Sequence, residues 1–343
     1  MAGLGWTFEE LVYYFDQSPS APGDLNPIIK QLLMTCPGSS VFGIGGHSVV
    51  LWISPDIAAK VSLQSGDERL RHEQEIFKLL DQSECPQVIQ CFFRGVDVSF
   101  LELITNGTLH DRMSINKPRP ILQWMLQLSS AAACLEALGY AHGDINPQNI
   151  LLDINDQVKL IDFDHSPRVG DMLDVGYEPY VRQHREITGG IYGIAGSITE
   201  QFALGSVFWY MTRGSELYSE LEGSDQVDRL LDGNFPTTHP QDPIDHIIRN
   251  CWNGHYLRIA DLVGDIKDLL GVGIQVQGVI PPSQRNERRR RCEECYSLVN
   301  PSHKLRTVEG EFRSKEEDGY DEPLTTTLSF RSFLKRSWSL LTA

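Results

Sequence analysis

Residues 142–164, HGDINPQNILLDINDQVKLIDFD, limit the possible folds of this chain more than any other stretch. Gly143 and Pro147 disfavour a helix at the start of the segment. The polar side chains of Asp144 and Asn149, five residues apart, are therefore expected on one irregular loop. Such a loop can direct both side chains toward the same space.

Two short strands are predicted directly after that loop. Residues 150–152 are a straight apolar run, residues 155–156 favour a turn, and residues 158–161 return with an apolar pattern. Asp162 follows the second strand, so two carboxylates and one amide are expected at a common opening. Hard oxygen ligands of this type suit Mg²⁺ and a phosphate chain, while one carboxylate remains to orient a hydroxyl group.

The spacing of these residues resembles the protein kinase signature, an HxD loop with Asn five residues on, followed by a DFG-type motif. Gly143 stands in place of an Arg, which argues against regulation by an activation-loop phosphate. Asn146 stands in place of a Lys, from which we expect slower chemistry. Asp164 replaces the Gly of DFG and makes the backbone less free there. The alternative is that these polar residues are only turn residues beside two buried strands.

The charge of the chain is unevenly distributed. Residues 1–280 contain 18 Lys and Arg against 36 Asp and Glu, and residues 281–343 contain 12 against 10, which together give the net charge of −16. An acidic body argues against a nucleic-acid-binding core, because attraction to phosphates dominates that affinity. It accepts ATP only where local cations and metal ions oppose the overall field.

The seven cysteines lack the rhythm of a disulfide framework, which favours a reducing compartment. The sequence contains no standard secretion signal and no apolar window of membrane-spanning length. We therefore expect a cytoplasmic protein, with the nucleus as the second option, and a monomer.

The first 37 residues are expected to form an N-terminal extension. Thr7 and Glu10 are spaced as a capping box at the start of an amphipathic helix over residues 7–16. Residues 26–35 are a second candidate helix. The favoured interpretation is an extension that packs on the surface of the main domain.

Residues 41–60, VFGIGGHSVVLWISPDIAAK, have the pattern of two or three strands with a glycine-rich turn. Glycines let a hairpin backbone approach a phosphate group closely. Lys60, with Ala58 before it, resembles the AxK of kinases that pairs with the α- and β-phosphates; the alternative is an exposed strand lysine. The positions that the resemblance assigns to ATP here are Gly43, Gly45, Gly46, Ser48, Val50 and Lys60.

A helix is predicted over residues 65–81, with Ser65 and Glu68 as its capping box. Glu73 lies in the middle of the apolar stripe of this helix. A carboxylate that faces inward needs a cation, because removing one partner of a buried ion pair costs about 3–5 kcal/mol. Lys60 is the expected partner, as in the ion pair of active kinases. Glu75, on roughly the opposite face, is the second candidate.

Residues 87–104 predict two strands around a turn at Gly95. By resemblance, Glu102 and Leu103 then form the hinge that offers backbone groups to adenine, and Leu101 gates the pocket behind it. A long buried helix is expected over residues 122–138, leading into the HxD loop.

The segment after Asp164 is expected to be a long irregular surface loop. The APE triplet of kinases is absent, and Glu178 with Pro179 comes too early to replace it, so the peptide-docking platform has no secure counterpart. Residues 199–214 predict an apolar helix in which Glu200 replaces the Asp that braces the HxD backbone. This helix and the stretch IDFDHS resemble a divergent kinase group of filamentous fungi.

Residues 279–343 are expected to be a mostly disordered tail, because they are rich in charge and poor in periodic apolar residues. Arg288–Arg291 are a candidate patch for nuclear import or an anionic surface, although a solvated tail is favoured. Cys292 and Cys295 form a lone CxxC, from which no zinc site is expected. Residues 329–341 predict a basic amphipathic helix that contacts a partner, its own domain or an anionic membrane.

The resemblance extends over residues 38–278 and implies an α+β, bilobal protein kinase-like fold. The small β-rich N-lobe would span residues 38–104 and contain one main helix, and the larger helical C-lobe would span residues 105–278. The implied cofactors are ATP and Mg²⁺, and the implied reaction is phosphorylation of Ser or Thr in a protein substrate.

The resemblance also implies a role for each site residue. Lys60 would contact the phosphates, Glu73 would pair with Lys60, and Asp144 would orient the acceptor hydroxyl. Asn149 and Asp162 would bind the metal. Two alternatives are a pseudokinase scaffold without efficient transfer and a small-molecule phosphotransferase of the aminoglycoside or choline type.

Overall fold

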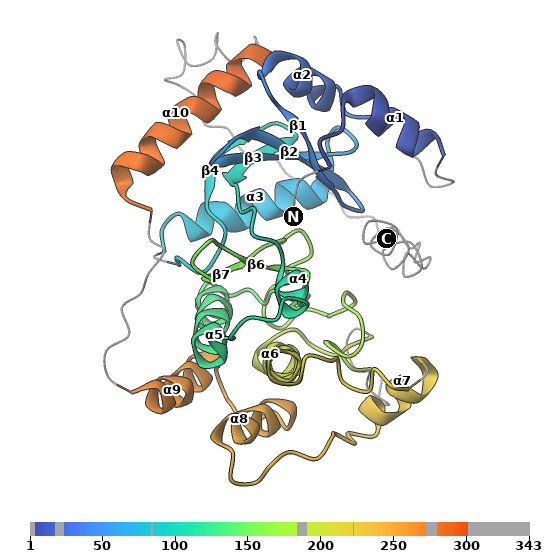
Figure 1. Cartoon of the computed structure of the whole chain (residues 1–343), viewed down its shortest axis with the longest axis vertical. Coiled ribbons are helices and arrows are strands. Elements are labelled where there is room, and N and C mark those ends of the chain that lie inside the picture. The colour runs from blue at the N-terminus through green and yellow to red at the C-terminus, as the bar shows by residue number, and fades with distance from the viewer. Residues whose placement is uncertain are drawn as a thin grey trace, which may run out of the picture.

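The computed structural model describes residues 4–17, 24–83, 85–183, 191–221, 223–271 and 280–300. Two bodies of secondary structure are stacked in it: an N-terminal lobe built on a five-stranded sheet and a C-terminal lobe built mainly of helices (Figure 1). The prediction of an α+β fold with two unequal lobes is thus confirmed. None of the helices in these ranges is long and apolar enough to cross a membrane.

The sheet of the N-terminal lobe is antiparallel throughout, with the strand order β1-β2-β3-β5-β4. Its strands are β1 (Ser40–Ile44), β2 (Ser48–Ser54), β3 (Ile57–Ser62), β4 (Cys91–Gly95) and β5 (Val98–Glu102). All residues of β3 are buried, because β3 is the central strand. Lys60 lies on β3 opposite Val50 of β2, and only 7% of it is exposed, which rules out the exposed strand lysine.

The main helix of this lobe is α3 (Glu68–Leu80). Its N-cap is Asp67, whose side chain accepts a hydrogen bond from the Arg69 N–H at 2.7 Å. The predicted capping box from Ser65 is therefore wrong: Gly66, with φ of +78°, has a left-handed conformation that a right-handed helix cannot include. The apolar face of α3 packs inward and carries Glu73 with it.

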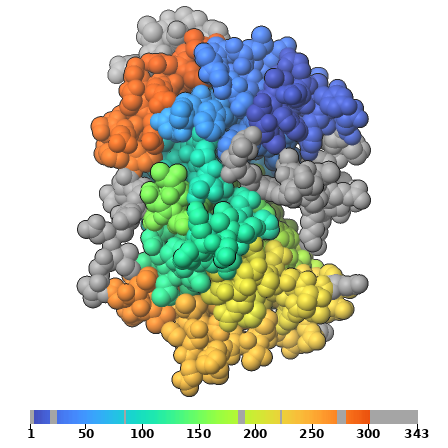
Figure 2. Space-filling view, in the orientation of Figure 1, coloured from blue at the N-terminus to red at the C-terminus, as the bar shows by residue number. Residues whose placement is uncertain are grey.

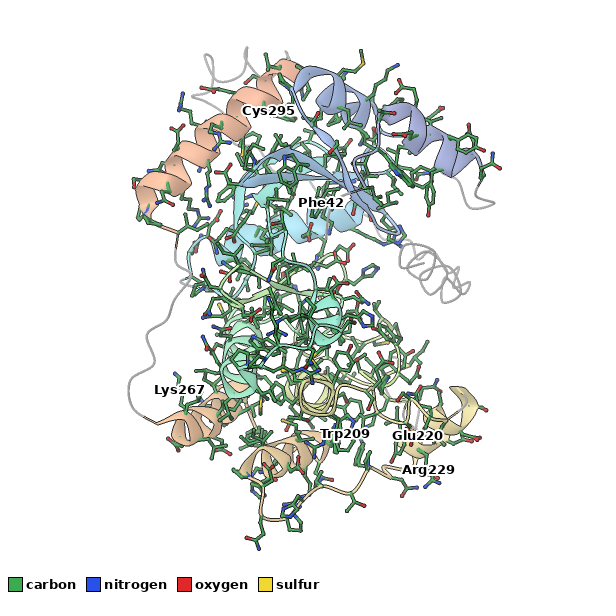
Figure 3. All side chains as sticks on the ribbon, in the orientation of Figure 1. Phe42, Trp209, Glu220, Arg229, Lys267 and Cys295 are labelled. Carbon is green, nitrogen blue, oxygen red and sulfur yellow. A yellow bond between two sulfur atoms is a disulfide. The ribbon has the colours of Figure 1, made fainter. Side chains whose placement is uncertain are left out.

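The C-terminal lobe surrounds two long apolar helices. Its elements are α4 (Leu109–Met113), α5 (Ile121–Ala137), the hairpin of β6 (Ile150–Leu152) and β7 (Val158–Leu160), α6 (Ser197–Arg213), α7 (Gly223–Leu231), α8 (Pro243–Trp252) and α9 (Ile259–Leu270). α9 packs against α5 and α8 against α6, so α5 and α6 are mostly buried. Trp209 of α6 contacts Trp252 of α8 in this core, with ring centroids 5.6 Å apart (Figure 3).

Two further helices, α1 (Phe8–Asp16) and α2 (Pro27–Thr35), lie against the first strands of the sheet (Figure 1). The capping box at the start of α1 is present: the Glu10 N–H donates to Thr7 Oγ at 3.3 Å, and the Thr7 N–H donates to Glu10 Oε2 at 2.7 Å. Leu11 and Ile29 are fully buried in the same apolar cluster as the sheet. The N-terminal arm therefore shares a core with the lobe.

The prediction of a mostly disordered chain from residue 279 is wrong for α10 (Pro282–Val299). This helix packs against β4 and α2, on the N-terminal lobe and away from α9 (Figure 2). Its buried residues are Cys292, Cys295, Tyr296 and Val299, whose spacing places them on one helical face. One short apolar stripe thus packs this highly charged segment on the N-terminal lobe. The predicted helix at 329–341 lies outside the described residues.

The run of four arginines on α10 is divided between two faces. Arg288 Nε lies 3.0 Å from Asp56 Oδ2, and Arg291 Nη2 lies 2.9 Å from Asp56 Oδ1, in the turn between β2 and β3. Arg289 and Arg290 instead pair with glutamates of α10 itself. Two of the four arginines thus form ion pairs with the N-terminal lobe. This differs from both predictions, a free basic patch and a solvated tail.

Cys36, at the end of α2, and Cys295 of α10 form a disulfide bond. Figure 3 labels Cys295 where α10 meets α2. The spacing of the cysteines did not indicate this bond, because the two residues are separated by 259 positions in the chain. The described free cysteines are Cys85, Cys91, Cys134, Cys251 and Cys292.

Candidate functional site

The loop between α5 and β6 is held from below by α6. Glu200 of α6 accepts the His142 N–H on Oε2 at 2.9 Å and the Gly143 N–H on Oε1 at 3.0 Å. Burial raises the pKa of Glu200 to about 7, although these two N–H groups lower it. Glu200 therefore binds the backbone N–H groups of the HxD loop, the role that the resemblance assigns to an aspartate.

The local structure explains why position 143 is a glycine. Its φ of +79° favours glycine, and an added Cβ would lie 2.8 Å from Pro167 Cδ and 3.2 Å from Leu173 Cδ1. A larger residue cannot occupy this position without moving the segment that follows β7. The departure from the usual Arg is thus built into the packing of this loop.

Asp144 is surrounded by two side-chain amides. Asn146 Nδ2 donates to Asp144 Oδ1 at 3.0 Å, and Asn149 Nδ2 donates to Asp144 Oδ2 at 2.9 Å. Burial raises the pKa of Asp144 to about 7, although both amides lower it. The side-chain oxygen of Asn146, Oδ1, accepts a hydrogen bond from the Gln148 N–H at 2.9 Å. Asn146 therefore organises the loop and leaves it without a cation.

Lys60 joins the two lobes. Its Nζ lies 2.9 Å from Glu73 Oε1 of α3 and 2.7 Å from Asp162 Oδ1, just beyond β7. Burial opposes the charged ammonium, but the charges of Asp162 and Glu73 outweigh it and raise the pKa of Lys60. The expected ion pair is therefore present, and Asp162 extends it across the lobes.

The aromatic ring of Phe163 anchors this arrangement. Its centroid lies 5.5 Å from that of Phe77 on α3 and 5.3 Å from that of His142, both in edge-to-face geometry. The Phe163 N–H donates to Glu73 Oε1 at 3.3 Å, and His142 Nε2 lies 2.9 Å from the Ile161 carbonyl oxygen. These contacts fix α3 and its carboxylate relative to the loop of the other lobe.

The glycine-rich turn between β1 and β2 is closed by the Gly45 N–H, which donates to the Ser48 carbonyl at 2.8 Å. An added Cβ at Gly43 would meet no atom within 4 Å, and one at Gly45 would touch only Ser48. The space beside these two glycines is therefore open. Gly46 lies in the same turn, and Ser48 and Val50 lie on β2.

The N–H groups of the two predicted hinge residues are already hydrogen-bonded within the lobe. The Glu102 N–H donates to the Gln90 carbonyl at 2.8 Å, and the Leu103 N–H donates to the Asp56 carbonyl at 3.3 Å, because strand pairing continues past β5. The Glu102 carboxylate lies 3.1 Å from Nζ of the buried Lys159. Among the described hinge residues, Ile104 is the first whose N–H has no backbone acceptor, which adds it as a candidate donor beside the backbone groups predicted at Glu102 and Leu103.

The donor set fits the groups that the resemblance implies. Asp162 and Asn149 supply one carboxylate and one amide, which suits Mg²⁺ because this ion usually takes one or two protein ligands together with substrate phosphates. The Asn149 carbonyl accepts the Ile161 N–H at 3.0 Å, so the two ligand-bearing segments are tied together. Asn149 and Asp162 are therefore the residues that would hold the metal ion.

The segment after β7 folds back on itself. The Tyr192 N–H donates to the Leu173 carbonyl and the Leu173 N–H to the Gly193 carbonyl, each at 2.9 Å. Arg258 pairs with Asp261 at 2.7 Å, and the Glu178 carboxylate accepts a hydrogen bond from Gln183. Arg258 and Glu178 therefore each contact another residue and not one another. Residues 184–190 lie outside the described ranges.

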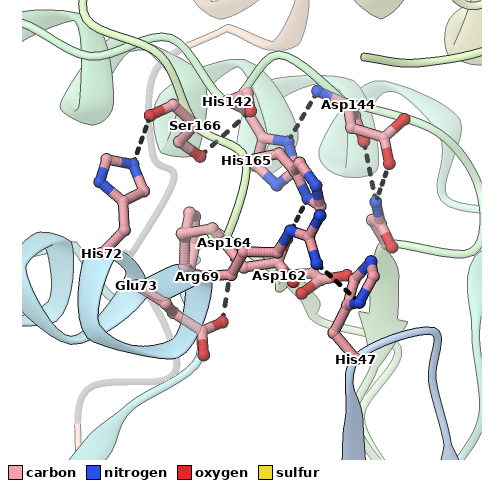
Figure 4. Close-up of polar contacts among 12 residues, drawn as sticks. His47, Arg69, His72, Glu73, His142, Asp144, Asp162, Asp164, His165 and Ser166 are labelled. Carbon is pink, nitrogen blue, oxygen red and sulfur yellow. Dashed lines mark hydrogen bonds and ion pairs between the residues drawn. The ribbon is translucent and has the colours of Figure 1, made fainter. Parts of the chain in front are cut away.

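Sequence reasoning missed three basic side chains near the site. Arg69 Nη1 lies 2.7 Å from Nδ1 of His47 in the glycine-rich turn, and His165 Nδ1 lies 2.6 Å from Asp164 Oδ1 (Figure 4). The charge of Asp164, which replaces a glycine, is thus paired with its neighbour. No sequence motif marks Arg69 or His47, because they meet only through the fold.

Comparison with known proteins agrees with this geometry. The family profile described as "Protein kinase domain" matches residues 55–253, a range that begins after the glycine-rich turn. Salt tolerance receptor-like cytoplasmic kinase 1 of Oryza sativa subsp. japonica is 27% identical over 238 residues, which cover 57% of this chain and 65% of the rice protein.

Two other relatives align over shorter stretches. Human dual specificity mitogen-activated protein kinase kinase 7 is 32% identical over 127 residues, covering 34% of this chain and 30% of that protein. The probable serine/threonine-protein kinase FMP48 of Saccharomyces cerevisiae is 31% identical over 147 residues, covering 36% and 39%. The chain thus spans less than two thirds of the length of these relatives.

Proposed function

The chain belongs to the protein kinase family, and from this we propose that it transfers the γ-phosphate of ATP, with Mg²⁺, to serine or threonine hydroxyls of a protein substrate. The observation that carries the proposal is the position of Lys60, 2.9 Å from Glu73 and 2.7 Å from Asp162. A lysine held between α3 and the end of β7 is suited to contact phosphates beside a metal ligand.

In the proposed reaction the acceptor hydroxyl oxygen forms a bond to the γ-phosphorus as the bond to the β–γ bridging oxygen breaks. Asp144 orients the hydroxyl and accepts its proton, Lys60 contacts the phosphates, and ADP leaves. Bound Mg²⁺ would neutralise developing charge on the phosphate oxygens, with Asn149 and Asp162 as its protein ligands. Phosphoryl transfer depends mostly on positioning and charge stabilisation, so Asp144 need not be a strong base.

The choice of Ser or Thr as acceptor is the finer part of the proposal. The printed name of the yeast relative describes a probable serine/threonine kinase, and that of the human relative a dual-specificity kinase. Membership of the divergent group of filamentous fungi is proposed on the stretch IDFDHS and the helix α6.

The test is γ-phosphate transfer to the protein itself and to a generic Ser/Thr acceptor. We expect Asp162→Asn to lose transfer by about 100-fold or more, because it removes the charged metal ligand. The matched control is Asp171→Asn, an identical change at an exposed position outside the site, which should retain activity. Equal transfer by wild type and Asp162→Asn would contradict the site assignment.

The same assay separates the alternative functions. Transfer to amino-alcohol acceptors but not to protein would support a small-molecule phosphotransferase. MgATP binding without transfer to any acceptor would support a scaffold, an alternative motivated by Asn146, Asp164, Glu200 and the absent APE triplet.

A further inference from the structure

Two free cysteines from different lobes meet outside the proposed site. Cys85 lies in the segment between α3 and β4, and Cys134 lies near the end of α5. The Cys85 thiol donates a hydrogen bond to the Cys134 sulfur, although the two residues are far apart in the chain. Two thiols in contact are the reactants from which a disulfide bond forms.

Both cysteines are positioned by elements that pack on β7. The Leu160 N–H donates to the Gln87 carbonyl at 2.8 Å, so the segment that contains Cys85 lies along this strand. The helix α5 packs against the same strand (Figure 1), and Gln127 of α5 accepts the N–H of its first residue at 2.9 Å. Cys134 follows Gln127 by about two helical turns, which places both on one face of α5. The meeting of the two thiols is therefore fixed by the packing of the lobes.

The two thiols differ in their access to solvent. Cys85 is a member of the main apolar core and only 6% of it is exposed, whereas Cys134 is half-buried at the edge of that core. The hydrogen bond from Cys85 lowers the pKa of Cys134, and the same bond together with burial raises the pKa of Cys85. Because the thiolate is the nucleophilic form, Cys134 is the thiol that a small oxidant can reach and react with.

The other free cysteines of the described chain do not share this environment. Cys91, Cys251 and Cys292 are buried, and burial raises the pKa of each thiol. Buried thiols in apolar surroundings are inert. Oxidation should therefore be selective for Cys134 and its neighbour.

We propose that Cys134 and Cys85 form a redox site that reduces a hydroperoxide and becomes a disulfide bond between the two lobes. The inference goes beyond phosphoryl transfer and does not depend on it. Its substrate is a small hydroperoxide, because only the half-buried edge of the pair is open to solvent.

The reaction has two steps. The Cys134 thiolate attacks a peroxide oxygen, the O–O bond breaks, and the sulfenic acid of Cys134 forms; the released alkoxide or hydroxide takes the proton that Cys134 lost. The Cys85 sulfur then attacks the Cys134 sulfur, the S–O bond breaks, and water leaves with the Cys85 proton. Two thiols are oxidised to one disulfide, and the hydroperoxide is reduced to an alcohol or water.

The test is mass spectrometry of the full chain, with the Cys36–Cys295 bond intact, after exposure to hydrogen peroxide. The intact protein should lose about 2 Da, because two hydrogen atoms leave. After denaturation in N-ethylmaleimide and digestion without reductant, a peptide linked through Cys85 and Cys134 should be present. This measurement is made on the wild type, so it does not depend on the folding of any variant.

Two variants separate the steps. In Cys85→Ala, peroxide should convert Cys134 to a sulfenic acid that dimedone traps, without a disulfide. In Cys134→Ala, the Cys85 thiol should be lost about tenfold more slowly than in the wild type, because it is buried and protonated. The matched control is Cys292→Ala, the same change at a buried cysteine outside the pair, which should form the Cys85–Cys134 bond at the wild-type rate.

Three results would overturn the proposal. The first is that the wild type keeps both thiols at a peroxide concentration that oxidises free glutathione. The second is a bond between Cys91 and Cys292 in place of the expected one. The third is oxidation of Cys134 to a sulfinic acid without any disulfide. None of these measurements uses ATP, so their failure would leave the proposed function as it stands.

Discussion

Asp144 is surrounded by two side-chain amides, one of them from Asn146, which stands where a lysine is usual. Asn146 and Asn149 each donate to one of its carboxylate oxygens, at 3.0 and 2.9 Å. Burial nevertheless raises its pKa to about 7, far above the usual 3.8. Protonation near neutral pH follows, because the neutral carboxyl is favoured below the raised pKa and the carboxylate above it.

Transfer should therefore depend on pH near neutrality. The carboxylate orients the hydroxyl, so kcat/KM should rise through about pH 7, and at pH 6 it should lie about tenfold below its plateau. The measurement is a pH profile of kcat/KM from pH 5.5 to 8.5. A flat profile would contradict a role for the ionised carboxylate.

Two variants identify the titrating group. Glu200 has a pKa near the same value and acts in the same direction, since its carboxylate holds the catalytic loop. In Glu200→Gln the midpoint should stay near 7 if Asp144 is responsible. In Asn146→Ala the midpoint should move to higher pH, because one amide that stabilises the carboxylate is lost.

The ion pair of the site could be predicted because it follows from a local requirement. A carboxylate on the apolar stripe of α3 needs a cation, and this requirement predicts the ion pair of Glu73 with Lys60. Which backbone groups of the hinge remain available could not be predicted, because the bond between the Leu103 N–H and the Asp56 carbonyl depends on how far the strands run together. That register is a property of the folded sheet.

At the scale of elements, α10 is fitted to β4 at one glycine. A Cβ added to Gly95 would lie 2.5 Å from the Tyr296 ring, and the Val96 N–H donates to the Tyr296 hydroxyl at 3.0 Å. The Tyr296 ring can therefore approach the strand this closely because Gly95 has no side chain.

Gly95→Ala should destabilise the protein by about 1–3 kcal/mol, because the ring cannot move without disturbing the helix. In a Tyr296→Ala background the same change should cost almost nothing, so the two effects are strongly non-additive. Urea denaturation of the two single variants and the double variant measures the coupling. As a control, Gly264→Ala on α9, where no atom lies within 4 Å, should not destabilise. Additive effects would contradict the contact.

At the scale of the whole molecule, the described C-terminal helix returns to the N-terminal lobe. α10 is joined to α2 by the Cys36–Cys295 disulfide and to the β2–β3 turn by Arg288 and Arg291 on Asp56. The carbonyl of Asp56 accepts the Leu103 N–H at the hinge. The arm, the sheet and α10 thus form one body above the catalytic loop.

Loss of the disulfide should lower the free energy of unfolding by about 2–4 kcal/mol, because the bond closes a long loop and restricts the unfolded chain. The measurement is urea denaturation of the oxidised protein, with and without reductant, beside Cys295→Ser. Reductant should have no further effect on the Cys295→Ser variant. Equal stability of the oxidised wild type and the variant would contradict a stabilising bond.

Local pattern was sufficient for the strands of the N-terminal lobe, for the helices α1, α2, α3, α5 and α6, and for the grouping of Lys60, Glu73, Asp144 and Asp162. Motif spacing along two short strands places the last two, and the cost of a buried charge pairs the first two. Local pattern did not predict α10, because its highly charged sequence contains only one short stripe of buried residues. It also did not predict the contacts of Cys36 with Cys295 and of Arg69 with His47. These contacts join segments far apart in the chain, so they depend on how whole elements pack.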